Sequence, residues 1–266
     1  MKDWFYFTLK KNVSFKEACK ELLSFQCEEC SLLEDTASGD QKICAKADLS
    51  LFPTYLTTIR QYEIIPPTTW EDQWRQFCPY FQGDLCNIPL SDFFPSCQET
   101  LQLYPGPGFG DLSHPTTCLM MKLMNDYIQN TVAIDLGCGS GVLSLAALKA
   151  GARFVYSLDI EEEALIHTRK NAALNHLQDR LQISRFLNQH PDPTPSLLLM
   201  NMTFLEQKQA FSSLPTSLSL TYLISSGILK TQKQAYLSWV QSLGFTLVSL
   251  KTQGEWIGCV FTSRKA

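Results

Sequence analysis

Residues 135–141 read Asp-Leu-Gly-Cys-Gly-Ser-Gly, and they lie between an apolar run at 132–136 and a helix-like run at 142–150. Gly151 then interrupts the chain, and a second apolar run, 153–158, ends in Asp159. This order predicts a strand, a glycine turn, a helix and a second strand. Glycines let the backbone approach a ligand at the start of a helix, and a carboxylate at the next strand end binds the hydroxyls of a ribose. The pattern therefore indicates a nucleoside site that includes Asp159.

The spacing of the glycines separates two kinds of nucleoside cofactor. A dinucleotide site has the pattern GxGxxG, whereas Gly137, Gly139 and Gly141 follow GxGxG, and Val142 stands where the third glycine would be. Asp135 adds a carboxylate that would repel a pyrophosphate but would accept hydrogen bonds, directly or through water, from a cationic amino-acid tail. We therefore expect S-adenosylmethionine as cofactor, bound by these three glycines and Asp135.

Other segments resemble one methyltransferase family. Residues 105–117 read Pro-Gly-Pro-Gly-Phe-Gly-Asp-Leu-Ser-His-Pro-Thr-Thr. Together with residues 135–141 and Asp159, they resemble the methyltransferases of large-subunit ribosomal protein L11, the PrmA family of class I methyltransferases. The segment 70–74 resembles that family's tryptophan-rich linker, Asn201 follows an apolar run as in its Asn-Ile-Leu-Ala segment, and 226–229 match its Ser-Gly-Ile-Leu. The resemblance extends from about residue 70 to the end.

The resemblance implies an α/β fold with a mostly parallel, Rossmann-like sheet, a terminal antiparallel hairpin and a small N-terminal α+β domain. The expected limits are 1–65 for a substrate-recognition domain, 66–100 for a linker with a helix, and 101–266 for the S-adenosylmethionine-binding domain. The expected reaction is methyl transfer to lysine or α-amino groups of a large-subunit ribosomal protein.

The resemblance also implies roles for single residues. Thr117 and Phe109 would cover the cofactor, and Asn201 and Phe204 would orient the amine. His114 invites a reading as a proton acceptor, although a cap of the helix that begins at Pro115 explains it equally well. After Phe109-Gly110 the family has Thr-Gly, whereas this chain has Asp111-Leu112, and this departure affects the lid over the cofactor.

The residues alone leave several alternative roles and functions open. Asn201 would also serve as the cap of the next helix, and Asn201-Met-Thr-Phe204 resembles, without its two prolines, the Asn-Pro-Pro-Tyr motif of enzymes that methylate amide or exocyclic nitrogens. The rivals are therefore a methyltransferase of the same fold acting on an amide nitrogen or a small molecule, and a non-catalytic binding protein. An NAD-linked oxidoreductase comes third.

Composition limits the partners and the compartment. The chain has 266 residues, 45% of them hydrophobic, with a net charge of −4. A chain without clustered Lys and Arg is a poor binder of naked nucleic acid, so we expect a basic protein partner and no nucleic acid. The N-terminal segment has no apolar signal region, and no apolar run is long enough to span a membrane, which predicts a cytoplasmic protein; a monomer is expected.

Ten cysteines raise the question of a metal. Cys27 and Cys30 have metal-ligand spacing, but a structural zinc site needs two further ligands and no second pair follows. We expect reduced thiols and no metal.

Apolar periodicity predicts the remaining elements. The first part combines an apolar run at 4–9, helices at 15–23 and 49–60, and a strand at 62–65. Trp70, Trp74 and Phe77 share one face of a short helix that would dock on the catalytic domain. Glu161–Glu163, His167, Arg169 and Lys170 form a solvated helix face. The later pattern predicts strands at 181–187, 196–202 and 220–225, helices at 115–128, 205–211 and 231–243, and a hairpin of 245–250 with 256–263.

Overall fold

The chain forms two compact units, residues 1–69 and residues 70–266. The computed structural model describes residues 3–34, 41–53, 55–64, 69–189, 191 and 193–264, and side chains are described in these ranges except at 3–4 and 29–34. Each unit has its own hydrophobic core. Cys30 lies outside the described side chains, and no group of three or more metal-ligating side chains occurs among the described residues.

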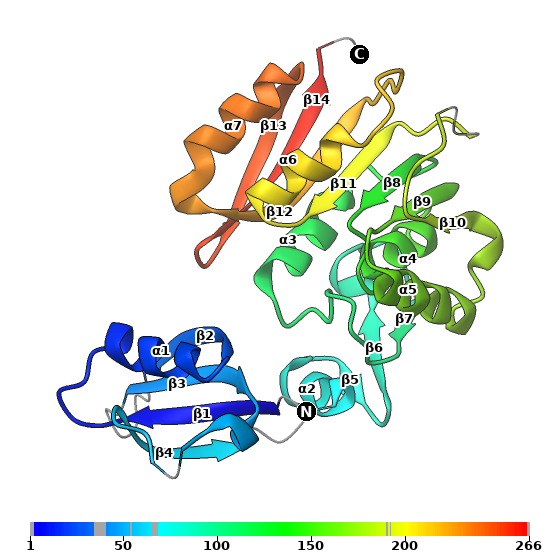
Figure 1. Cartoon of the computed structure of the whole chain (residues 1–266). Coiled ribbons are helices and arrows are strands. Elements are labelled where there is room, and N and C mark those ends of the chain that lie inside the picture. Colours follow the sequence, from blue (N-terminus) through cyan, green and yellow to red (C-terminus); the bar gives the residue numbers. More distant parts are fainter. Residues whose placement is uncertain are drawn as a thin grey trace. The chain divides into compact units, whose positions relative to one another are not determined.

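The N-terminal unit is a four-stranded antiparallel sheet with one helix (Figure 1). Its strands β1 (Asp3–Leu9), β2 (Glu28–Glu34), β3 (Gln41–Ala47) and β4 (Ile59–Ile64) follow the order β2-β3-β1-β4. Helix α1 (Phe15–Ser24) begins with a capping box in which Ser14 and Glu17 satisfy each other's backbone N–H. Its Leu22 is fully buried with Phe7 and Ile43 from the sheet. This confirms the small α+β architecture.

The predicted helix at 49–60 is wrong. Among the described residues of this range, only Leu49–Leu51 are helical, as a single 3₁₀ turn, and Ile59 already begins β4, which pairs with β1. Pro53 disfavours a helical conformation at Phe52.

Thr57 and Thr58 donate their backbone N–H and hydroxyl groups to the carboxylate of Glu21, with Thr57 N–H at 2.6 Å. Burial opposes ionisation of Glu21, but these hydrogen bonds prevail and lower its pKa to about 2.

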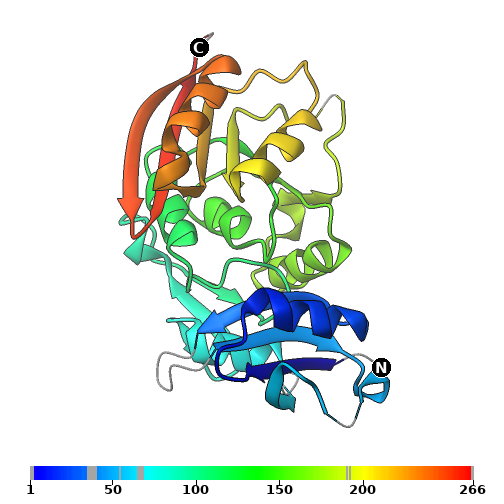
Figure 2. The same cartoon turned by 60° about the vertical axis from the view of Figure 1, so that its left-hand side comes forward.

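The second unit is built on a seven-stranded sheet with the order β10-β9-β8-β11-β12-β14-β13 (Figures 1 and 2). Strands β8 (Val132–Leu136), β9 (Phe154–Leu158), β10 (Leu181–Ser184), β11 (Leu197–Asn201) and β12 (Tyr222–Leu229) are parallel. The hairpin of β13 (Phe245–Gln253) and β14 (Trp256–Ser263) follows, and β14 inserts antiparallel between β12 and β13. The predicted Rossmann-like sheet with its terminal hairpin is therefore confirmed.

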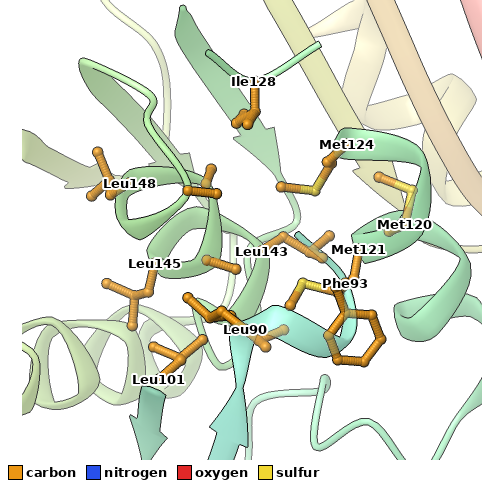
Figure 3. Packing of buried hydrophobic residues seen from close by; sticks show 14 of the residues in the cluster. Leu90, Phe93, Leu101, Met120, Met121, Met124, Ile128, Leu143, Leu145 and Leu148 are labelled. Atoms are coloured by element: carbon orange, nitrogen blue, oxygen red, sulfur yellow. The ribbon is translucent and has the colours of Figure 1, made fainter. Parts of the chain in front are cut away.

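Helices cover both faces of this sheet. Helices α3 (Pro115–Met124), α4 (Val142–Lys149) and α5 (Glu162–Leu174) pack on one face, and α6 (Phe204–Ser212) and α7 (Lys233–Ser242) on the other. Alternate residues of β8 supply the two cores, Ala133 on the α4 side and Ile134 on the α7 side. Figure 3 shows Met121 of α3 and Leu143 of α4 in the first core.

Residues 70–103 are part of the second unit. Helix α2 (Trp70–Phe77) is followed by a three-stranded antiparallel sheet of β5 (Phe81–Gln82), β6 (Leu85–Pro89) and β7 (Thr100–Leu103). The aromatic stripe does not bury as a whole: Trp74 is 4% exposed, whereas Trp70 is 48% and Phe77 is 59% exposed. No helix in the described part of the chain is both long and apolar enough to cross a bilayer.

Candidate active site

A cavity of about 750 Å³ lies at the carboxyl ends of β8, β9 and β11, where open α/β sheets bind their ligands. Five of the predicted site residues line it, and four do not. The lining ones are Phe109, Gly137, Gly139, Asp159 and Asn201. The others are Thr117, Asp135, Gly141 and Phe204.

The glycine loop, residues 137–141, is held by the end of β9. Gly137 N–H donates to Leu158 O at 2.8 Å, and Gly139 N–H donates to Asp159 Oδ2 at 3.0 Å. Asp159 Oδ1 accepts from Glu161 N–H at 3.0 Å. Gly137, Gly139 and Gly141 have φ values of 78°, 57° and 81°, a region that favours glycine. The loop thus brings its backbone and the Asp159 carboxylate to one side of the cavity.

The proline–glycine loop, residues 104–110, lies directly on the glycine loop. Ser140 N–H donates to Phe109 O at 2.9 Å. A Cβ atom on Gly108 would come within 2.4 Å of the Gly139 carbonyl carbon, so only glycine permits this approach. The Phe109 ring is 51% exposed and lines the cavity, as expected for a residue that covers a ligand.

Asp135 lies behind the glycine loop and is buried. Its Oδ2 accepts from Ser144 Oγ at 2.6 Å and from Ser144 N–H at 3.1 Å, while its Oδ1 has no partner in the described structure. Burial raises the pKa of Asp135 to about 6, against the opposing effect of the Ser144 hydrogen bonds. The sequence predicted that this carboxylate binds the cofactor, directly or through water, whereas the structure places it beneath the loop, because Asp135 faces α4 from within β8.

Asn201 ends β11 and lines the cavity. Its Nδ2 donates to Thr117 Oγ1 at 3.4 Å, and its Oδ1 is buried without a partner in the described structure. Thr117 is fully buried and holds Asn201 from behind, while its neighbour Thr116 lines the cavity. The alternative of a helix cap is wrong, because Thr203 caps α6 through a capping box with Glu206.

Phe204 is turned away from the cavity. Its ring packs against Tyr236 at 5.3 Å and Trp239 at 5.7 Å between centroids, and Lys208 Nζ lies 4.6 Å from its centroid. The predicted role of Phe204 in orienting the amine is therefore wrong, because its ring packs on α7 and does not line the cavity. The packing of Phe204 therefore removes the observation that favoured an amide nitrogen.

His114 is the N-cap of α3 and also lines the cavity. Its Nδ1 accepts from Thr116 N–H at 3.4 Å and lies 2.8 Å from Thr116 Oγ1, so the neutral ring carries its proton on Nε2. Burial lowers the pKa of His114, which favours this neutral form. The capping geometry therefore makes the remaining nitrogen a donor and not a proton acceptor.

The departure at Asp111-Leu112 is a local turn. Asp111 Oδ1 accepts from Ser113 Oγ at 2.6 Å and from Ser113 N–H at 3.0 Å. Leu112 has a φ of 65°, which leucine rarely adopts, and its side chain is 3% exposed. Burial of the Leu112 side chain thus offsets the strain of its left-handed backbone conformation.

Sequence reasoning missed several residues of the wall, among them Trp256, Ile160 and Phe186. Trp256 from β14 stacks its ring edge-on against His114 at 4.9 Å, and Ile160 and Phe186 line the cavity with 69% and 62% of their surface exposed. Exposed apolar residues beside a strand end signal a ligand surface, which would have identified Ile160 next to Asp159. Trp256 gave no such signal, since its partner lies far away in the sequence.

The charged side chains of the cavity wall are mostly acidic. Asp159, Glu161, Glu163 and Glu206 line it, against one cation, Arg185. This surface disfavours a pyrophosphate and favours a cationic ligand. Two buried acceptor oxygens without a partner, Asp135 Oδ1 and Asn201 Oδ1, lie at the ends of the adjacent strands β8 and β11. A ligand with hydrogen-bond donors fits Asn201 Oδ1, which faces the cavity, whereas Asp135 Oδ1 lies beneath the glycine loop.

Comparison with known proteins gives one consistent result. A family model described as ribosomal protein L11 methyltransferase (PrmA) matches residues 10–264. A protein of that name from Legionella pneumophila (strain Paris) is 33% identical over 210 residues, which are 76% of this chain and 71% of that protein. One from Oceanobacillus iheyensis is 32% identical over 166 residues, 60% of this chain and 52% of that protein. That match thus spans about half of the relative's length.

A solved structure agrees. The crystal structure of a ribosomal protein L11 methylase from Lactobacillus delbrueckii subsp. bulgaricus superimposes with a TM-score of 0.55 and 26% sequence identity. The superposition covers 66% of this chain and 98% of that chain. The likeness therefore extends to the three-dimensional fold.

Proposed function

This chain belongs to the ribosomal protein L11 methyltransferase (PrmA) family, and we propose that it transfers a methyl group from S-adenosylmethionine to amino groups of a ribosomal protein. The observation that carries the proposal is the meeting of the glycine loop, Asp159 and Asn201 at one cavity. Relatives of this chain carry the name of that activity, which supports the substrate class.

The residues present fit the cofactor. Asp159 would accept hydrogen bonds from the ribose hydroxyls, and Gly137 and Gly139 leave room for the ligand beside their backbone. Ile160 and Phe186 offer exposed apolar surface for the base. The Asp135 carboxylate lies beneath the glycine loop and does not line the cavity, so it would favour the cationic amino-acid tail through its charge and not by direct contact. When bound, the cofactor supplies an electrophilic methyl on a sulfonium.

The protein's contribution to the reaction is to position the acceptor and exclude water. Such a displacement needs an in-line approach of a neutral amine, and correct orientation supplies much of the rate. Asn201 Oδ1, which lacks a partner, would accept an N–H of the amine, while Thr117 holds the Asn201 amide in place. Phe109, His114 and Trp256 form an aromatic wall beside it.

We propose that the N-terminal unit selects the protein substrate. Its strand β4 is an edge of the described sheet, and Tyr62 and Ile64 on that strand are 50% and 56% exposed. An edge strand with exposed apolar side chains is suited to binding another chain. Ile64→Lys should raise KM for the ribosomal protein and leave the affinity for adenosylhomocysteine unchanged; unchanged KM would contradict this role.

The overall proposal is tested by label transfer. The protein is incubated with methyl-labelled S-adenosylmethionine and ribosomal proteins from a strain that lacks the homologous activity. We expect one large-subunit protein to be labelled, and Asn201→Ala to lower the rate by about 10- to 100-fold, the effect of a hydrogen bond of about 1.5–3 kcal/mol to the amine nitrogen as it gains positive charge. Cofactor binding without labelled protein would favour a small-molecule acceptor. Absence of cofactor binding would overturn the proposed S-adenosylmethionine-dependent activity.

A further inference from the structure

Four polar residues on one face of α5 and at its C-cap are buried: His167, Thr168, Asn171 and Asn175 are 3%, 0%, 0% and 9% exposed. We call them the α5 ladder. The sequence predicted a solvated helix face here. The charged residues Arg169 and Glu162 are indeed exposed, and they lie 3.2 Å apart. The prediction for His167 is wrong. Buried polar groups need hydrogen-bond partners, so the question is which groups the ladder binds.

The ladder binds the backbone of the proline–glycine loop. His167 Nε2–H donates to Tyr104 O at 2.8 Å, and Gly108 N–H donates to His167 Nδ1 at 3.1 Å. Asn171 Oδ1 accepts from Tyr104 N–H at 2.8 Å. A Cβ atom on Gly106 would lie 2.6 Å from His167 Nε2, so the loop passes directly over the imidazole.

The same face of α5 binds the glycine loop. Thr168 Oγ1–H donates to Gly139 O at 3.0 Å, and Asn171 Nδ2–H donates to Ser140 O at 2.9 Å. One side chain, Asn171, thus uses its oxygen for one loop and its nitrogen for the other. The proline–glycine loop and the glycine loop are therefore both hydrogen-bonded to the one buried side-chain amide of Asn171.

The surroundings hold His167 in one protonation state. Its ring contacts Trp74 of α2 edge-on, with centroids 5.9 Å apart. Burial lowers the pKa of His167, and Lys170 acts in the same direction against the Tyr104 hydrogen bond. In the neutral ring, Nδ1 accepts from Gly108 and Nε2 donates to Tyr104, so both nitrogens serve the loop.

We propose that Asn171 and His167 are positioning residues that set cofactor affinity by holding the proline–glycine loop, which carries Phe109, against the glycine loop. The inference rests on the proposed S-adenosylmethionine site. Neither residue lines the cavity, so each acts through the backbone that it binds.

Asn175 provides the matched control within the same ladder. Its Oδ1 accepts from Gln102 N–H at 3.1 Å, and its Nδ2 donates to Gln102 O at 2.6 Å and to Asn171 O at 2.8 Å. Asn175 therefore makes the same kind of bonds as Asn171, one turn later, but to β7, which does not line the cavity. A loss of stability or affinity that is due only to removing a buried amide should therefore be equal for substitutions of Asn171 and Asn175.

The test compares Asn171→Ala with Asn175→Ala by calorimetric binding of adenosylhomocysteine, urea unfolding and backbone amide exchange without ligand. Both variants should lose stability. Asn171→Ala should weaken binding about tenfold or more, as expected for the loss of its two hydrogen bonds to the loops, and speed exchange at Tyr104. Asn175→Ala should stay within about twofold of the wild type, below the effect of one lost hydrogen bond. Equal affinities in the two folded variants would overturn the inference.

A second variant covers the possibility that Asn171→Ala does not fold. His167→Gln keeps a polar side chain but lacks the geometry to bind Tyr104 and Gly108 together. It should weaken binding and speed exchange at Gly108, and unchanged values for both would also overturn the inference. A wild-type protein that binds no adenosylhomocysteine would contradict the proposed function instead, so the two failures are distinguishable.

Discussion

The carboxylate of Asp159 accepts a hydrogen bond from the backbone N–H of Gly139 at 3.0 Å, which joins the end of β9 to the glycine loop. The same carboxylate lines the cavity, so it holds the loop and faces the ligand at once. We expect Asp159→Asn to weaken adenosylhomocysteine binding by about 10- to 100-fold, because a hydrogen bond to a charged group contributes about 1.5–3 kcal/mol. Calorimetry measures it, with the exposed Asp179→Asn as the charge-matched control. Equal affinities in both variants would contradict the role of Asp159.

Asp135 should make stability depend on pH. Its pKa is about 6 in the folded protein, against about 3.9 for an unperturbed aspartate, so folding favours its protonated form. The stability that this preference contributes is present below the unfolded pKa and is lost as pH rises through about 6. Between about pH 7 and pH 4 the wild type should therefore gain about 2–3 kcal/mol relative to Asp135→Asn. Urea unfolding at both pH values checks this, and parallel pH profiles of the two proteins would refute it.

At Leu112, substitution by glycine should destabilise the protein less than substitution by alanine, which is the reverse of the usual order. Leu112→Ala removes a buried side chain at a cost of about 2–5 kcal/mol and keeps the left-handed conformation. Leu112→Gly loses the same burial but relieves about 1–2 kcal/mol of backbone strain. The glycine variant should thus unfold at a higher urea concentration. In Leu119, buried within α3, glycine should instead be the worse substitution by about 1 kcal/mol. The same order at both positions would disprove the explanation.

Trp74 should carry the stability of α2. Trp74→Ala should cost about 3–5 kcal/mol, as for a large buried aromatic, whereas Trp70→Ala, at a half-exposed position, should cost less than about 1 kcal/mol. Thermal or urea unfolding compares them directly. Equal losses of unfolding free energy in the two variants would instead support the predicted packing of the whole aromatic stripe.

The parts of the fold that were predictable from sequence have local causes. The glycine loop and Asp159 follow from apolar runs and turn residues that lie within a few positions of each other. His167 was misread because its neighbours, Glu161–Glu163 and Lys170, are charged, while its partners Tyr104 and Gly108 come from a distant segment. Phe204 was misplaced for the same reason, since Tyr236 and Trp239 decide its orientation. Pairings between distant segments leave no periodicity in the sequence.

The insertion of β14 between β12 and β13 has a consequence for biosynthesis. Trp256, which completes the aromatic wall with His114, is on that strand and is translated after every other lining residue of the cavity. A nascent chain that has emerged through β12 therefore exposes an apolar sheet edge and has an incomplete pocket. Contacts between residues so far apart in sequence form slowly. Folding of the second unit should consequently be complete only after β14 has been translated, and ligand binding should report its completion.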